Sequence, residues 1–447
     1  MKNLSYSYKD IIFLALPLMI SNFFYTLISF ADVVFMKEVG LAEQGAISFV
    51  ALLYLIFFMI SFSYTKGTQI FIARKDGENK QSHIGIIIDN TILVLAIVGL
   101  ILFTTFHFFS YEILGFFLDK KEVLEAAHDY LDIRKYGFLY GFLGAVFIAY
   151  YSGISKVGIL AFAIASMSVT NIFLNWVLIF GKFGFPEMGI KGAAWASNIA
   201  EIVSILIMMA GIYFGKYHKR HLMFSFKLIR WEYIAKISKI STPLVFMSLI
   251  SLFGWLAFFS MIEKMGIVAL AVSSDVKQIY TILGIPAFAL ASTTNTLIGN
   301  VIGKKKYHEI IPLTKRMIMV SLVFILAFVG IAKLFPRQIL SLIMEDAIIE
   351  DSLVILDISL IALIIYAIAN VIFNTVVTLG SNRISIFIEV IVMSSYMLYL
   401  YFAFYIVKDD LALAWLSEWL YWALIALFSV IYLKYGNWEK KLHIKSR

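Results

Sequence analysis

Four polar side chains recur along the first long apolar stretch of the chain. Their spacing of three, four and three residues is that of one helix face: Asn22, Tyr25, Ser29 and Asp32. Hydrocarbon penalises buried polar groups, so this face should point toward a cavity or toward other polar groups. A carboxylate placed there could hold a proton or a cation. Pro17, about four turns earlier, removes a backbone hydrogen bond and gives the helix a place to bend.

Two later apolar stretches carry polar groups at a similar depth. Asn171 and Asn175 are four residues apart and share a helix face, and Ser197 and Asn198 follow in the next stretch. A rise of about 1.5 Å per residue places all four roughly 9–15 Å below the membrane surface from which Asp32 is reached. Carboxylate, amide and hydroxyl oxygens suit a proton or an alkali cation better than zinc or copper.

We therefore predict a coupling site for H⁺ or Na⁺, with no cofactor and no transition metal, at four residues: Asp32, Asn171, Asn175 and Ser197. Interhelical hydrogen bonding alone would explain the asparagines. The nearby acid favours an ion-binding role for the group. The Na⁺ alternative would draw on the oxygens of Asp32, Asn171 and Asn175.

A second polar set lies in the later apolar stretches. Asp275 and Lys277 are two residues apart, so on a helix they point in different directions. Lys277 and Glu418 lie at matching depth and could form an interhelical ion pair. A structural salt bridge and a second ion site both remain open for these residues.

Three further acids interrupt apolar stretches. Glu201 could line the same cavity as Asn198 or bond to a neighbouring helix. Glu389 is expected to reach water from near the end of its stretch, and Asp89 to be solvated.

The two halves of the chain align at an offset of 226 residues without a gap over two helices. Four pairs of identical residues coincide: Pro17 with Pro243, Gly40 with Gly266, Thr68 with Thr294, and Gly77 with Gly303. The halves differ in their polar groups, because Asp32 aligns with Phe258, and Trp195–Asn198 mirrors Trp415–Glu418. Duplicated membrane bundles are typical of transporters.

Composition and pattern predict an all-α integral membrane protein. Apolar residues make up 61% of the chain and charged residues 15%, well below the usual quarter of a soluble domain. Twelve stretches approach the roughly 20 residues that cross a bilayer: 10–34, 44–72, 84–110, 136–156, 158–181, 189–215, 237–262, 267–302, 312–335, 353–379, 384–407 and 411–434. No room remains for a catalytic domain, so we do not expect an enzyme.

Six stretches per half predict two six-helix lobes related by a parallel pseudo-two-fold repeat. The lobes would span 1–215 and 236–434, joined by a basic linker at 216–235 and followed by a basic tail at 435–447. A monomer is expected, because each half supplies a partner for the other. Segment 111–135 is predicted to be an external amphipathic helix at the membrane surface, without a role in the site.

The net charge of +8 reflects topology. Basic residues gather in loops that all belong to one side, which predicts a cytoplasmic (inner) membrane protein with both termini in the cytoplasm. No folded domain offers a basic face, so no nucleic-acid partner is expected. The first apolar run is too long for a cleaved signal, and the chain has no cysteine for disulfides.

The chain resembles the multidrug and toxic compound extrusion (MATE) transporters over nearly its whole length. The resemblance rests on ALPLMISNFFYTLISFADVVFMKEVG at 15–40, TNIFLNWVLIFG at 170–181, MGIKGAAWAS at 188–197, TPLVF at 242–246 and LGIPAFALASTTNTLIGNVIGKKK at 283–306. It implies two lobes in a V around a central cleft. It also implies antiport, in which an inward H⁺ or Na⁺ gradient expels small cationic or amphiphilic compounds.

The resemblance also extends to single residues. Asp32 matches the family's acid in the first helix, and Asn171 matches a family asparagine. Asn175 stands where members have aspartate or asparagine, and Ser197 where threonine is frequent. The acids of members with a cation site in the second lobe fall near Ser251 and Tyr366 here, and neither is acidic. Coupling through the first lobe is therefore expected, with H⁺ or Na⁺ left open.

Three other classes compete with this prediction. A lipid-linked oligosaccharide flippase, a relative with similar repeats, is the main alternative, although such proteins usually have further spans and a cavity rich in cationic residues. An intramembrane enzyme would need a convergent set of groups, such as HExxH or paired aspartates on adjacent helices, and the sequence shows no such set. A channel would be expected to show repeated pore loops.

Overall fold

The computed structural model describes residues 5–226, 229–344, 348–407 and 410–445. Helices form nearly all of the described chain, which contains no strand. Residues 227–228 of the predicted linker and 446–447 of the predicted tail lie outside the described residues. The prediction of an all-α fold is confirmed.

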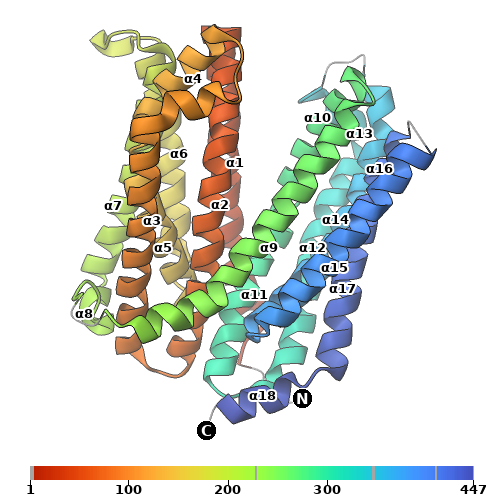
Figure 1. The fold of residues 1–447 in the computed structure, drawn as a ribbon. Coiled ribbons are helices and arrows are strands. Elements are labelled where there is room, and N and C mark those ends of the chain that lie inside the picture. The colour runs from red at the N-terminus through yellow and green to blue at the C-terminus, as the bar shows by residue number, and fades with distance from the viewer. Residues whose placement is uncertain (1–4, 227–228, 345–347, 408–409, 446–447) are drawn as a thin grey trace. The chain divides into compact units, whose positions relative to one another are not determined.

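The first half of the chain contains eight α-helices and one 3₁₀ turn, Lys182–Gly184, in the part described (Figure 1). The helices are α1 (Tyr8–Val39), α2 (Leu41–Gly77), α3 (Gln81–Gly115), α4 (Lys121–Arg134), α5 (Gly137–Gly153), α6 (Gly158–Ile179), α7 (Gly189–Phe214) and α8 (Tyr217–His221).

The second half begins with α9, which has a proline inside it, as α1 does. Its described helices are α9 (Trp231–Glu263), α10 (Ile267–Leu283), α11 (Ile285–Gly303), α12 (Ile310–Leu334), α13 (Pro336–Ser341), α14 (Ile349–Thr378), α15 (Asn382–Phe402), α16 (Leu411–Trp415), α17 (Ser417–Tyr435) and α18 (Trp438–Lys445). A 3₁₀ turn at Tyr307–Glu309 precedes α12, and a π-helical turn at Ala403–Val407 follows α15.

The repeat predicted from the sequence is visible in the helix bounds. Adding 226 to the bounds of α2 gives 267–303, the range from the start of α10 to the end of α11. The predicted span 267–302 therefore consists of two helices that meet at Gly284, with Pro286 in the first turn of α11. Proline favours a helix start because its missing N–H is not needed there.

The fourth span also differs from its prediction. It consists of two helices, α4 and α5, separated by Lys135 and Tyr136. Its counterpart in the second half of the repeat is one continuous helix, α14. Segment 111–135 contains the predicted amphipathic helix, α4, which has an exposed face but also packs into the bundle. That it has no role in the site stays a prediction. α4 packs against α2, α3 and α7, and its last residue, Arg134, is buried.

Eleven described helical segments are long and apolar enough to cross a membrane, and α5 is a shorter apolar helix. Together they account for the twelve predicted spans. The eighth of those spans is represented by α11 alone, since α10 does not meet the same criterion. The chain is a multi-pass membrane protein.

Contacts divide the chain into two compact units, and the division falls inside two helices. One unit comprises residues 20–241, and the other comprises 1–19 and 242–447. The first boundary lies two residues after Pro17 in α1, and the second lies two residues before Pro243 in α9. The predicted lobe limits, 1–215 and 236–434, stay a prediction. Each proline therefore stands where a helix passes from one unit to the other.

The beginnings of α1 and α9 each belong to the unit that does not contain the rest of their helix, and we call them the exchanged helix beginnings. Hydrogen bonds attach each of them to that unit. The start of α9 belongs to the unit of residues 20–241, where Tyr233 bonds to His83 at 2.6 Å and Ser238 to Tyr64 at 2.9 Å. Residues preceding α1 belong to the other unit, where the hydroxyl of Tyr6 donates to Asn300 at 2.7 Å.

The basic linker is anchored by a buried acid. Asp89, expected to be solvated, is only 3% exposed, and its carboxylate accepts the backbone N–H groups of Phe224, Ser225 and Phe226 at 2.8–3.1 Å. The backbone N–H of Arg230 donates to the neighbouring Asn90. The expectation for Asp89 is therefore wrong.

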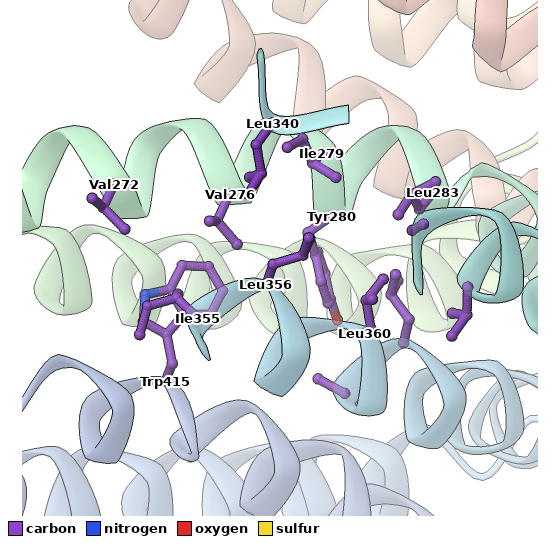
Figure 2. Packing of buried hydrophobic residues seen from close by; sticks show 14 of the residues in the cluster. Val272, Val276, Ile279, Tyr280, Leu283, Leu340, Ile355, Leu356, Leu360 and Trp415 are labelled. Carbon is purple, nitrogen blue, oxygen red and sulfur yellow. The ribbon is translucent and has the colours of Figure 1, made fainter. Parts of the chain in front are cut away.

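An apolar core fills the unit that contains α10, α14 and α17. Val272, Val276 and Tyr280 of α10 face Leu356 of α14 and Trp415 of α16 (Figure 2). The indole N–H of Trp415 donates to Ser273 at 3.1 Å, so the one polar atom of this buried ring has a partner.

Candidate functional site

Three helices of the unit formed by residues 20–241 meet in a chain of hydrogen bonds. The amide of Asn175 (α6) donates to the Asp32 carboxylate (α1) at 2.6 Å and to the side-chain oxygen of Asn171 at 3.1 Å. The Asn171 amide in turn donates to the Ser197 hydroxyl (α7) at 3.1 Å. Tyr130 of α4 bonds to the same hydroxyl. The four residues predicted for the site thus form one continuous network.

The site lies where α6 and α7 approach each other closely. Asn171, Asn175 and Ser197 are buried, and Asp32 is partly exposed. A Cβ atom on Gly192 would lie 2.7 Å from the Leu178 carbonyl, so only glycine allows this contact between the two backbones. Close helix packing therefore fixes the amides, while the carboxylate keeps access to its surroundings.

One oxygen in this network has no hydrogen-bond partner within the described residues. It is the side-chain oxygen of Asn175, which is buried beside the amide group that binds Asp32. A buried acceptor without a donor is unfavourable and marks a place where a ligand could bind. Together with the Asp32 carboxylate it offers two oxygens to a bound cation, or a carboxylate–amide pair to a proton.

A second charged pair lies beside this network. Arg134 of α4 forms an ion pair with Glu201 of α7 at 2.7 Å and also donates to the Asn198 side chain. The Asn198 amide donates to the carbonyl of Ile133 at 2.7 Å, so α7 is hydrogen-bonded to the C-terminal end of α4. The guanidinium stacks 4.4 Å from the ring centre of Tyr54 on α2.

Glycines make room for this pair on α5. A Cβ on Gly137 would lie 2.1 Å from the Tyr54 hydroxyl and 3.2 Å from the Arg134 guanidinium. Gly141, one turn later, faces the second carboxylate oxygen of Glu201, which is buried and has no hydrogen-bond partner in the described chain. The glycine face of α5 therefore accommodates the charged groups of α2, α4 and α7.

The charges of the two networks act on one another. Asp32 lies within electrostatic range of both Arg134 and Glu201, and Tyr25 lies within range of Glu201. When both acids are ionised, two negative charges face one positive charge. Because Arg134 neutralises Glu201 at contact distance, Asp32 carries the unbalanced charge of the site.

The remaining polar residues of α1 do not join the network. Ser29 is exposed, and its hydroxyl donates to the carbonyl of Tyr25 in its own helix. Asn22 is partly buried, and its backbone carbonyl accepts the Thr26 hydroxyl. Of the predicted polar face, Asp32 is therefore hydrogen-bonded to the network, and Tyr25 interacts electrostatically with Glu201.

The other unit arranges its charged residues differently. Lys277 does not form the predicted ion pair with Glu418 within 4.0 Å; its ammonium lies over the rings of Trp255 and Phe259. Glu418 is buried and accepts the indole N–H of Trp422 at 3.3 Å. Asp275 is partly exposed on the same helix as Lys277. Lys277 and Glu418 interact electrostatically at longer range.

Glu389 is also placed differently from its prediction. It is 2% exposed rather than solvated, and its carboxylate accepts the hydroxyls of Ser251 and Tyr421, each at 2.7 Å. Ser251 stands where the resemblance placed an acid of the second lobe. A buried acid on α15 thus reaches that position from a different helix.

The sequence did not point to Arg134, Tyr54 or Tyr130. Arg134 and Tyr130 lie on α4, and Tyr54 lies on α2, against which α4 packs. From the sequence, the α4 segment was predicted to lie outside the bundle. A usable signal was present: Arg134 lies three residues before the first of three glycines, at 137, 141 and 144, in an apolar run. Such small residues in a membrane helix indicate close packing.

Among the described residues, no group of three or more His, Cys, Asp and Glu side chains could hold a metal ion. The oxygen set around Asp32 consists of one carboxylate, two amides and a hydroxyl. It suits a proton or Na⁺ as a transported ion rather than a resident transition metal.

Known proteins share both the sequence pattern and the fold. The pattern of the MatE family matches residues 17–177 and 243–431. The probable multidrug resistance protein NorM of Thermotoga maritima is 25% identical over 77% of this chain and 74% of its own. The probable multidrug resistance protein YoeA of Bacillus subtilis is 25% identical over 74% of this chain and 72% of its own.

A crystal structure of a MATE in complex with MaL6 has the same fold, with a TM-score of 0.88 at 17% identity over 98% of this chain and 97% of that one. The family pattern covers well over half of the 447 residues, in both halves of the repeat. The chain therefore belongs to the MatE family, the multidrug and toxic compound extrusion transporters.

Proposed function

We propose that this protein is a secondary active transporter that exports small cationic or amphiphilic compounds in exchange for H⁺ or Na⁺. The observation that carries the proposal is the hydrogen-bond chain from Asp32 through Asn175 and Asn171 to Ser197. The names of the curated relatives, multidrug resistance proteins, support the substrate class.

Asp32 is proposed to be the coupling group. In its ionised form it would bind a coupling cation together with the free oxygen of Asn175, or favour a cationic substrate nearby. Once Asp32 is neutralised by a proton or Na⁺, its attraction for a cationic substrate is lost, and the substrate would leave. Exchange follows because one net negative charge cannot hold both cations equally well.

Pro17 is proposed to be the hinge of this step. It lies in α1 about four turns before Asp32 and two residues from the boundary between the contact-defined units. Without the N–H of Pro17, the helix lacks a bond to the carbonyl of Phe13 and bends there at lower cost. Neutralising Asp32 would thereby change the direction of the rest of α1.

The test replaces Asp32 by Asn. Gradient-driven ethidium efflux from intact cells should be abolished, while the protein still folds, because the amide keeps the shape of the side chain. Asp10→Asn, which changes an acid at the exposed start of the same helix, is the matched control and should retain efflux. Undiminished transport by Asp32→Asn would refute the proposal.

The coupling ion is identified in proteoliposomes with separately imposed pH and Na⁺ gradients. Substrate movement driven by the pH gradient alone indicates H⁺, and movement driven by the Na⁺ gradient alone indicates Na⁺. Both should disappear in Asp32→Asn.

We further propose that the protein lies in the cytoplasmic membrane with both termini in the cytoplasm, because its basic loops gather on one side. We propose a monomer, because each half supplies a partner for the other. The chain has no native cysteine, so single cysteines report topology directly. In intact cells a membrane-impermeant thiol reagent should label Lys120→Cys but not Lys80→Cys. The reverse pattern would overturn the orientation.

A further inference from the structure

The ammonium group of Lys277 is held by two aromatic rings. Its nitrogen lies 4.8 Å from the ring centre of Trp255 and 4.6 Å from that of Phe259, both on α9. The two rings are nearly parallel, with centres 5.7 Å apart and planes 22° apart. A cation within about 6 Å of a ring centre is attracted by the electrons of the ring face. The two rings thus form one surface that binds positive charge.

An acid adds to this attraction. Glu418 of α17 is buried and interacts electrostatically with Lys277 at a distance beyond contact. The Trp422 N–H binds one of its oxygens, which fixes the carboxylate in place. Aromatic faces beside a carboxylate are the chemistry by which proteins bind organic cations.

The position of these groups allows access. Trp255, Phe259 and Lys277 are each partly exposed, whereas Phe258 and Trp415 behind them are fully buried in the apolar core. The ring of Phe258 meets Trp415 edge to face at 5.5 Å, so the exposed aromatic surface rests on a rigid base. A ligand could therefore reach the rings if the lysine side chain turned away.

We propose that the Trp255–Phe259 surface beside Glu418 is a binding site for a monovalent organic cation, and that Lys277 occupies it in this structure as a tethered competitor. The inference rests on the proposed export of cationic compounds for its biological meaning. It adds a site in the second unit, separate from Asp32, and assigns its ligand class.

A tethered cation has a useful consequence for release. The lysine satisfies the rings and Glu418 when no substrate is present, so the empty site does not leave a buried acid without a compensating charge. A substrate must displace the lysine, and the returning lysine displaces the substrate. The flexible four-carbon side chain of lysine suits this exchange. A purely structural cation–π contact would instead hold the helices together and bind nothing.

The experiment measures binding of tetraphenylphosphonium to the purified full-length protein without any gradient. Triphenylphosphine oxide, which has similar rings but no net charge, is the uncharged probe. Lys277→Met removes the competitor and keeps the length of the side chain. Tetraphenylphosphonium binding should become about tenfold tighter, and binding of the oxide should not change. Lys333→Met, which changes a half-exposed lysine paired with Asp357, is the control and should alter neither probe.

Two further variants test the arrangement. Lys277→Arg should weaken tetraphenylphosphonium binding, because a guanidinium stacks on aromatic faces and is harder to displace. Combining Trp255→Leu and Phe259→Leu with Lys277→Met should remove the gain. The site is refuted if Lys277→Met leaves tetraphenylphosphonium binding unchanged, weakens it, or shifts both probes alike. If Lys277→Met does not fold, the direction of the Lys277→Arg shift decides.

This binding test is independent of the coupling site. The shift caused by Lys277→Met should persist in Asp32→Asn, because Asp32 belongs to the other unit. Loss of transport in Asp32→Asn together with an unchanged Lys277→Met variant would refute this site and leave the proposed function standing. A shift in binding by Lys277→Met together with normal transport in Asp32→Asn would support this site and refute the proposed function.

Discussion

The two units have repeat-related helices but opposite chemistry at equivalent positions. Where the first repeat has Asp32, hydrogen-bonded to Asn175, the second has Phe258, packed against Trp415. Trp195, the repeat counterpart of Trp415, is 42% exposed, whereas Trp415 is fully buried. The duplicated backbone therefore tolerates either a polar network or an aromatic core at the same place. The side chains, and not the helix arrangement, set the chemistry of each unit at this position.

The most disruptive way to test this comparison is to give the second unit the acid of the first. Phe258→Asp would place an ionisable group among buried rings with no amide to receive it. We expect a loss of at least about 4 kcal/mol of stability, which prevents accumulation of the folded protein. Phe258→Leu should fold at a cost of about 1–2 kcal/mol. Size-exclusion profiles and thermal unfolding in detergent measure both, and a stable Phe258→Asp protein would show that the units are interchangeable.

The charge pair of the first unit gives the next largest effect. Arg134→Gln leaves Glu201 without its counter-charge beside Asp32, and Glu201→Gln leaves Arg134 unpaired. Each single change should cost about 3 kcal/mol, whereas the double variant should recover most of the loss because no unpaired charge remains. Thermal unfolding of the three variants measures the recovery.

Transport provides a second measure for the same variants. Arg134 attracts the negative charge of Asp32 and Glu201 repels it. The pH profiles of efflux should therefore shift upward for Arg134→Gln and downward for Glu201→Gln, and return in the double variant. Shifts in the same direction, or none, would show that the pair has only a structural role.

The sequence predicted the first network better than its surroundings, for a physical reason. Helix periodicity and depth along a span are one-dimensional, so Asp32, Asn175 and Asn171 could be brought together from their spacing alone. Arg134 could not be found in this way, because its role requires α4 and α5 to act as one span. The position of Lys277 over Trp255 depends on side-chain conformation and packing, which spacing does not encode.

The anchors of the exchanged helix beginnings offer a milder comparison. Asp89 accepts three backbone N–H groups of the linker, whereas Glu309 accepts the backbone N–H and the hydroxyl of Ser5 and pairs with Lys306. Asp89→Asn should cost about 2 kcal/mol, because hydrogen bonds to a charged group are stronger than those to an amide. Glu309→Gln should cost less, since fewer backbone groups depend on it. Thermal unfolding of the two variants gives the order, and an equal or reversed order would contradict it.

The smallest expected effect concerns acid sensitivity of the linker in the first unit. His221 in α8 is 2% exposed and shares a hydrogen bond with Tyr150 at 2.9 Å. Burial, reinforced by the charge of Arg220, lowers the pKa of His221 to about 4. The unfolded chain takes up this proton near pH 6.5 and the folded chain only near pH 4, so stability falls as pH decreases between these values. Acidification from pH 7.5 to pH 5 should lower the melting temperature by a few degrees.

His221→Phe should remove this pH dependence, because it fills the same space without a titrating group. Hydrogen exchange at pH 5 should show faster opening around α8 and residues 222–226 than in α17, which lies in the other unit. Equal acceleration in both units would mean that the acid sensitivity arises elsewhere. A confined effect would show that the linker holding the start of α9 to the first unit opens before the core of either unit.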